Sequence, residues 1–128
     1  MNIKILDCTL RDGGYYNNWD FNRAIVDRYL TAVKASSVDV VELGFRFLPK
    51  NKFMGPYAYT TDDFINQLGL PKGPLYGVMI NGKEYIKNSD KSKSPINQFF
   101  QRKENSPLSL VRIAINFDNA LESELIAK

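Results

Sequence analysis

Apolar residues recur along the chain in two rhythms that alternate. Short runs rich in strand-forming residues are separated by segments in which apolar side chains recur every three or four residues. The first rhythm is typical of strands and the second of helices. The predicted strands cover 3–6, 38–44, 75–80 and 108–115. Strands alternating with helices favour an α/β fold with a parallel sheet and right-handed crossovers.

Capping residues mark where the helices are expected to begin. Asp20 is expected to cap a first helix that ends near Ser36, and Thr60 or Thr61 a short helix over 62–68. The other predictions are a long loop over 45–59, a polar, turn-rich segment over 83–94, one or two helical turns over 95–100, and a last helix from Asn119 with Leu121, Leu125 and Ile126 on one side.

The densest polar chemistry follows the first predicted strand, at 7–21. This stretch is interpreted as strand, loop and helix, so that its loop is a βα turn. Alternation continued from the strand places Asp7, Thr9 and Arg11 on one face. Because the carboxyl ends of parallel strands carry ligand sites in α/β proteins, 7–21 is the first candidate site.

Two charged residues of this stretch have chemistry of their own. Asp12 precedes a glycine pair, where its carboxylate could bind a hard divalent cation or could simply make a turn. Arg11 offers a forked donor that suits an enolate or carboxylate oxygen. It could also serve only as a structural bridge to Glu42 or Asp7.

Glu42 is the anomaly of an otherwise apolar strand. Alternation places it on the inner face with Val38 and Val40, where an unpaired carboxylate is costly. We therefore expect it to pair with Arg11, with Arg112 or with both. A structural ion pair and a direct catalytic role both remain open at this point.

The heptapeptide at 7–13, Asp-Cys-Thr-Leu-Arg-Asp-Gly, resembles the signature of the metal-dependent aldolase and acyl-CoA lyase superfamily, which includes hydroxymethylglutaryl-CoA lyase, isopropylmalate synthase and 4-hydroxy-2-oxovalerate aldolase. The similarity continues at 40–44 and 110–114. The resemblance implies a TIM barrel and a divalent metal that stabilises an enolate. It also implies that Asp12 is a metal ligand, that Arg11 stabilises oxyanion charge and that Glu42 is the characteristic acid of the second strand.

Length and histidine content limit what this chain can do alone. A complete (β/α)8 barrel takes about 250 residues, whereas the chain has 128 and contains no histidine. Residues 1–128 are therefore interpreted as one unit, the N-terminal half of a TIM barrel with about four parallel strands. The resemblance implies a His-x-His pair late in the barrel, so we expect this chain alone to be inactive and to bind neither Mg²⁺ nor Mn²⁺ tightly.

We expect the full-length protein to use one of these metals and to cleave or form a carbon–carbon bond next to the carbonyl of a small 2-oxo acid. Its catalytic base stays unassigned; Tyr15 and Tyr16 could donate to a substrate oxygen or pack over the barrel mouth. Two alternatives are a non-catalytic binding or regulatory protein derived from a barrel, acting through the loop after Gly44, and a swapped half-barrel that self-assembles.

Composition changes this interpretation little. The apolar fraction of 44% and the charged fraction of 24% are those of an ordinary globular domain. With one cysteine, Cys8, no internal disulfide can form. Because the sequence contains no long apolar run, we expect neither a membrane segment nor a signal peptide. The expected location is therefore the cytoplasm. The lysines between Lys83 and Lys103 are interpreted as a solvated loop, and no nucleic-acid partner is expected.

Half a barrel would leave two open sheet edges and an uncovered inner face. The expected apolar patch comprises Ile3, Ile5, Val38, Val40 and the segment 76–78. Because such a patch is larger than a monomer usually exposes, we expect a homo-oligomer, most simply a two-fold dimer.

Overall fold

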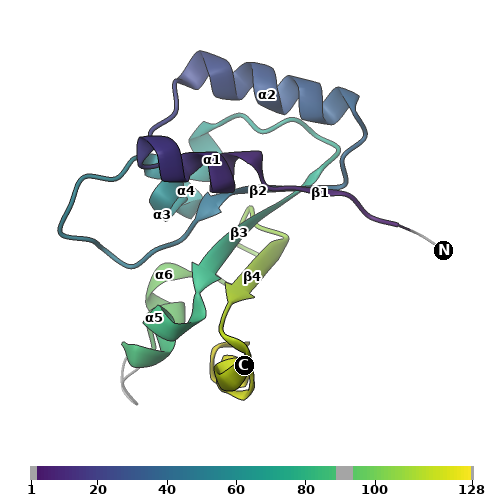
Figure 1. Ribbon diagram of the computed structural model, residues 1–128. Coiled ribbons are helices and arrows are strands. Elements are labelled where there is room, and N and C mark those ends of the chain that lie inside the picture. The colour runs from purple at the N-terminus through teal and green to yellow at the C-terminus, as the bar shows by residue number, and fades with distance from the viewer. Residues whose placement is uncertain (1–2, 89–93, 128) are drawn as a thin grey trace.

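The computed structural model describes residues 3–88 and 94–127. It contains a parallel sheet with the strand order β1-β2-β3-β4, and helices separate the successive strands (Figure 1). This confirms the predicted α/β class and is consistent with half of a (β/α)8 barrel. The strands are β1 (Leu6–Asp7), β2 (Val40–Phe45), β3 (Leu75–Asn81) and β4 (Leu110–Ala114).

The helices fall into two groups. Figure 1 shows α2 running beside the sheet near β1 and β2, whereas α5, α6 and the C-terminal helices gather near the tips of β3 and β4. None of the helices within residues 3–88 and 94–127 has the length and apolar character needed to cross a bilayer. The helices are α1 (Thr9–Asn17), α2 (Arg23–Ala35), α3 (Pro56–Tyr59), α4 (Asp62–Gln67), α5 (Gly82–Lys87), α6 (Pro95–Phe99), the 3-10 helix η1 (Phe117–Ser123) and α7 (Glu124–Ala127).

The prediction that 7–21 continues a strand into a loop is wrong. β1 ends at Asp7 and α1 begins at Thr9, so the motif's charged residues lie in a helix. The cause is local, because the Asp7 carboxylate accepts the Thr9 N–H at 2.9 Å and turns the chain. The glycines that suggested a loop lie inside α1, and a Cβ at Gly14 would lie 1.9 Å from Trp19 Cδ1. Gly14 therefore makes room for the indole.

Most other helix boundaries agree with the sequence. Asn22 caps α2 in place of Asp20, since its side chain accepts the Ala24 N–H at 2.9 Å, and α2 ends at Ala35, next to the expected end. Thr61 caps α4, as one of the two alternatives predicted. The two-residue shift at the start of α2 follows from which polar side chain reaches a free N–H group.

Two predictions near the carboxyl end of the chain are wrong. Part of the segment expected to be turn-rich is α5, which begins after Asn81 because that side chain accepts the Glu84 N–H; residues 89–93 of the segment lie outside the described residues. The last helical segment begins at Phe117 as a 3-10 helix. Leu121 and Leu125 are exposed while Ile126 is buried, so they do not share one face.

The main core joins β2 and β3 to α2, with every residue of β2 buried. The predicted apolar patch is wrong in its central part, because Val40 and Val78 are buried. Helices α1 and α3 both contact β2 and cover it. Ile3 and Ile5, in contrast, are exposed.

Candidate functional site

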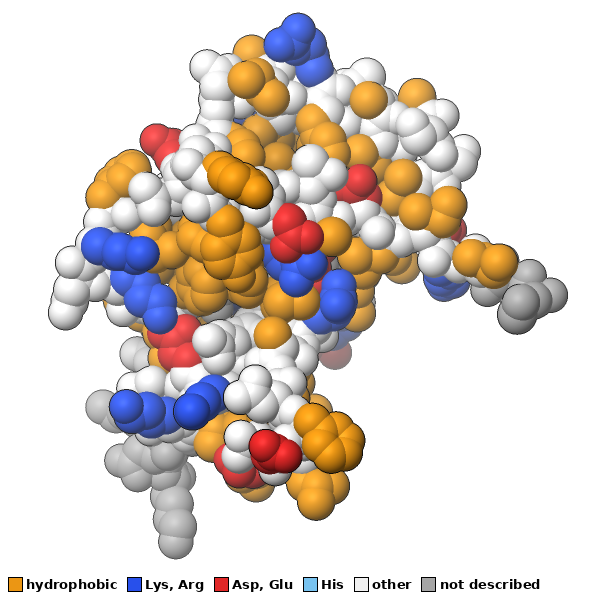
Figure 2. All heavy atoms as spheres, in the orientation of Figure 1, with side chains coloured by type: hydrophobic (Ala, Val, Ile, Leu, Met, Phe, Trp, Pro, Cys, Tyr) orange, Lys and Arg blue, Asp and Glu red, His pale blue; other side chains and the backbone are white. Residues whose placement is uncertain are grey.

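Charged residues from α1, β2 and β4 meet over one face of the sheet. Glu42 lies on β2 opposite Gly77, and Arg112 lies on β4 opposite Met79. Helix α1 brings Arg11 and Asp12 to the same place. We call Arg11, Asp12, Glu42 and Arg112 the Glu42 cluster. Figure 2 shows acidic and basic side chains side by side near the middle of this face, next to an apolar patch.

Glu42 pairs with both arginines, as expected from the sequence. Arg11 Nε lies 2.8 Å from Glu42 Oε2, and Arg112 Nη1 lies 3.5 Å from Glu42 Oε1. The Glu42 side chain is fully buried, whereas the side chains of Arg11 and Arg112 are 15% and 42% exposed. The carboxylate therefore lies beneath two guanidinium groups that can reach a ligand.

The contacts of Glu42 are ionic but poorly aligned. Although Arg11 Nε is close, its N–H does not point at the carboxylate, and neither Glu42 oxygen accepts a hydrogen bond within the part of the chain that the structure describes. Burial raises the pKa of Glu42, and the charges of Arg11 and Arg112 only partly offset this. The ionised carboxylate of Glu42 is thus stabilised only by the positive charges of the two guanidinium groups.

Arg11 is fixed from several sides. Its Nη1 donates to Met79 Sδ at 3.0 Å and its Nη2 to Asp12 Oδ2 at 3.2 Å. Its backbone carbonyl accepts the indole N–H of Trp19 at 2.8 Å. The motif arginine is therefore pre-oriented by both its head and its backbone, which is what an oxyanion-binding group requires.

Asp12 is the member of the Glu42 cluster that faces solvent. Its side chain is 56% exposed, and the Cys8 thiol donates to its Oδ2 at 3.2 Å. An exposed carboxylate fits a hard cation, but one carboxylate leaves most coordination positions to other donors. No group of three or more His, Cys, Asp or Glu residues that could hold a metal occurs within residues 3–88 and 94–127.

An aromatic group that the sequence did not point to lies beside α1. The rings of Phe45 and Phe47 are stacked with their centroids 4.3 Å apart, and Trp19 packs edge-on against both. Tyr15 packs edge-on against Trp19 and Phe45, while Tyr16 is exposed. The single tryptophan inside the motif stretch was the available signal, and its role is to anchor α1.

Arg46, which falls in the loop predicted over 45–59, is almost fully buried. Its Nη2 lies 2.6 Å from Asp62 Oδ1, its Nε donates to the Thr60 carbonyl and its Nη1 to the Phe99 carbonyl, each at 3.1 Å. The guanidinium also lies over the Phe100 ring. Arg46 thus ties β2 to α4 and α6.

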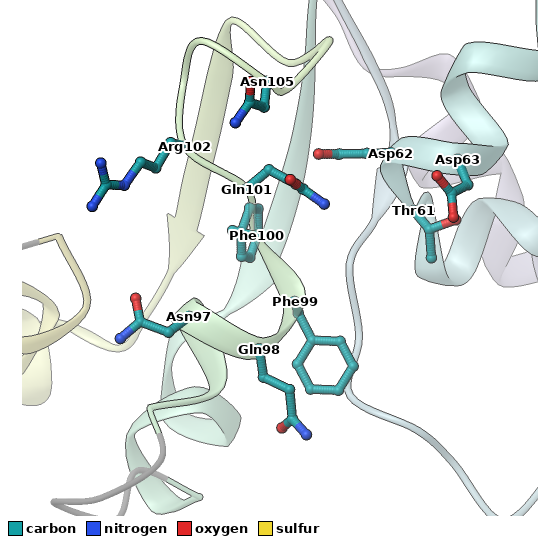
Figure 3. A pocket seen from close by; sticks show the side chains of 10 residues that line it. All are labelled: Thr61, Asp62, Asp63, Asn97, Gln98, Phe99, Phe100, Gln101, Arg102 and Asn105. Atoms are coloured by element: carbon teal, nitrogen blue, oxygen red, sulfur yellow. The ribbon is translucent and has the colours of Figure 1, made fainter.

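A polar hollow of about 430 Å³ lies between the start of α4 on one side and α6 with the segment that follows it on the other (Figure 3). Asp62 and Gln101 extend into it from opposite walls. It contains no residue of the 7–13 motif and no member of the Glu42 cluster. The motif chemistry therefore places the candidate site at the Glu42 cluster and not in this hollow.

One solved structure supports the aldolase resemblance. The chain is 35% identical to the crystal structure of the N-terminal domain of a putative aldolase from Bacteroides vulgatus, with a TM-score of 0.77. The match covers 98% of this chain and 40% of that chain, so the present chain spans less than half of its relative's length. A comparison with protein-family models finds no match, and a comparison with curated proteins finds none either. The similarity supports an aldolase-like relationship.

Proposed function

We propose that the full-length protein is an aldolase, a carbon–carbon lyase that acts on a small 2-oxo acid. The observation that carries the proposal is Arg11, a motif arginine held at the sheet by Glu42, Met79 and Asp12. The 35% identical N-terminal domain of a putative aldolase supports the same reaction class.

Arg11 would stabilise the negative charge that develops on the carbonyl oxygen as the bond breaks. A fixed guanidinium suits this role because its N–H groups need no reorientation during the reaction. Cleavage of a 4-hydroxy-2-oxo acid removes the proton of the 4-hydroxyl, breaks the C3–C4 bond and leaves an enolate and an aldehyde. Protonation of that enolate gives the 2-oxo acid.

Glu42 is proposed to act as a positioning residue. Because its carboxylate is fully buried beneath Arg11, it has no direct path to substrate. Its contribution would be to fix the direction of the Arg11 guanidinium. This assigns Glu42 the orienting role and leaves the general base unassigned.

Asp12 is proposed as one ligand of a divalent metal, Mg²⁺ or Mn²⁺, in the full-length protein. When bound, such a metal would polarise the substrate carbonyl. The exposed Asp12 carboxylate fits one coordination position, and the described residues offer no complete set. The remaining donors would come from other residues, from substrate or from water.

A retro-aldol assay of the full-length protein tests the proposal. 4-Hydroxy-2-oxopentanoate is supplied with Mg²⁺ or Mn²⁺, and the released pyruvate is measured. We expect turnover that falls by roughly 10²–10³-fold in Arg11→Lys, since one oriented oxyanion donor is lost. Arg102→Lys, an exposed arginine, is the matched control and should keep wild-type turnover.

Failure of the assay would favour the other class of function. If neither 4-hydroxy-2-oxo acids nor acyl-CoA with a 2-oxo acid react at any metal concentration, the aldolase proposal is wrong. A non-catalytic binding or regulatory protein would then account better for the chain. If Arg11→Lys and wild type show equal turnover, the aldolase activity stands but Arg11 has no role in the reaction.

A further inference from the structure

The two arginines of the Glu42 cluster differ in how many of their N–H groups are engaged. Arg11 donates hydrogen bonds from Nη1 to Met79 Sδ and from Nη2 to Asp12 Oδ2, and its Nε lies 2.8 Å from Glu42 Oε2 without an aligned hydrogen bond. The Arg112 side chain makes one ion pair, from Nη1 to Glu42 Oε1, and no other hydrogen bond or ion pair within residues 3–88 and 94–127. Because a guanidinium carries five N–H donors, most of those on Arg112 are available to a ligand.

The position of Arg112 keeps these donors accessible. Arg112 is the third residue of β4, and Glu42 lies two strands away on β2, so their contact passes over β3. Gly77 is the β3 residue opposite Glu42, and it has no side chain to block that path. With its side chain 42% exposed, Arg112 is held by Glu42 at one end of the guanidinium and is open elsewhere.

Stability does not account for Arg112. Glu42 already has Arg11 at 2.8 Å, and the contact to Arg112 is longer, at 3.5 Å. An ion pair with a partner this exposed contributes little to stability. A planar guanidinium with adjacent free N–H groups is well suited to a carboxylate, which it can bind through two parallel hydrogen bonds.

We propose that Arg112 binds the carboxylate of the substrate and so selects 2-oxo acids over uncharged carbonyl compounds. Because Arg11 and Arg112 contact the two oxygens of one Glu42 carboxylate, their guanidinium groups lie close enough to share one small ligand. Arg112 takes the C1 carboxylate and Arg11 the oxygen of the neighbouring carbonyl. This inference rests on the proposed function, which supplies the 2-oxo acid as the ligand class.

Equilibrium binding of pyruvate to the full-length protein tests the site without turnover. Pyruvate is titrated with Mn²⁺ present and again after chelation, and methyl pyruvate serves as the probe that lacks a carboxylate. Arg112→Gln should weaken pyruvate binding about tenfold to hundredfold, because a charge-assisted hydrogen-bonded contact is lost. Arg112→Lys keeps the positive charge but lacks the two parallel N–H donors of the guanidinium, so it should weaken pyruvate binding less. Methyl pyruvate should show no such dependence on residue 112.

Arg102→Gln is the matched control, since Arg102 is exposed and lines the polar hollow instead. Melting curves of each variant confirm that it is folded, and Arg112→Lys provides a second variant if Arg112→Gln does not fold. The inference is overturned if wild type does not bind pyruvate, if both Arg112 variants bind it as tightly as wild type, or if Arg102→Gln weakens it equally.

The carboxylate site and the aldolase activity can fail separately. If Arg112 variants lose pyruvate binding while no 4-hydroxy-2-oxo acid is cleaved, the carboxylate site stands and the proposed function fails. If cleavage occurs but Arg112→Gln leaves KM and pyruvate affinity unchanged, the proposed function stands and the role of Arg112 is wrong.

Discussion

Among the residues that the structure describes, the buried arginine–carboxylate pairs Arg46–Asp62 and Arg11–Glu42 are built differently. Arg46 is almost fully buried, and its nitrogens reach two backbone carbonyls as well as Asp62. The Arg11–Glu42 pair has its carboxylate fully buried, but neither oxygen accepts an aligned hydrogen bond among the described residues. In the Arg46–Asp62 pair the guanidinium nitrogens have hydrogen-bond acceptors, whereas the Arg11–Glu42 pair is held together by charge.

Under the proposed function, this difference separates a structural pair from a functional one. A buried guanidinium with its donors paired rigidifies the elements it joins, here the end of β2 with α4 and α6. A buried carboxylate held by charge alone adds little to stability, so stability alone does not explain why Glu42 is buried beneath two arginines. We propose that at the Glu42 cluster the carboxylate orients two guanidinium groups toward a ligand.

Arg46→Met should cause the largest loss of stability, roughly 3–5 kcal/mol, because removing one partner of a buried pair strands the other. The carbonyls of Thr60 and Phe99 would also lose their donor. Urea unfolding of the full-length protein measures the change, with Arg102→Met as the exposed control. A loss below that of Glu42→Gln would reverse the comparison.

Asp12→Asn should weaken Mn²⁺ binding to the full-length protein about tenfold to hundredfold, since a neutral amide replaces a charged ligand of a hard cation. Asp63→Asn is the matched control, because Asp63 is also exposed and lies on α4, away from the motif. Calorimetric titration separates them. Equal Mn²⁺ affinity in Asp12→Asn and wild type would exclude Asp12 as a ligand.

Glu42→Gln should cost at most about 1 kcal/mol, since no aligned hydrogen bond is lost and Arg11 keeps its contact with Asp12. Burial already disfavours the charged form, which is why the pKa of Glu42 is raised. Thermal unfolding beside Arg46→Met measures the difference. A loss of several kcal/mol would show that the Glu42 pair is structural after all.

The smallest expected effect is a pH dependence of opposite sign at Glu42 and Asp7. Because the pKa of Glu42 is raised on folding, its contribution to stability is present below the unfolded pKa and declines as pH rises through the folded one. Burial also acts to raise the pKa of Asp7, but hydrogen bonds from Tyr29 and Thr9 outweigh it and lower the pKa. The contribution of Asp7 is therefore lost as pH falls through its folded pKa.

Urea unfolding across acidic and neutral pH checks these signs. The cost of Glu42→Gln should shrink as pH rises, whereas the cost of Asp7→Asn should grow. Two costs that change in the same direction with pH would contradict the account of Glu42.

The sequence predicted those features that follow from the alternation of side chains along a strand and from the alignment of neighbouring strands. Glu42 stood out in an apolar strand, and alternation placed it with Arg112 on one face, where the structure pairs them. The α1 helix was missed because a single Asp7 side chain turns the chain, and two glycines suggested a loop. The structural role of Arg46 was missed because its partners Thr60 and Phe99 lie far away in sequence and come together only in the fold.

Turnover of Glu42→Gln in the retro-aldol assay decides whether the Glu42 cluster serves catalysis while the Arg46 pair serves stability. The assay is run on the full-length protein at a temperature where the variant and wild type are equally folded. We expect kcat to fall by about tenfold to hundredfold, because Arg11 loses the carboxylate that orients it toward the developing charge. A Glu42→Gln variant with wild-type kcat would contradict the claim.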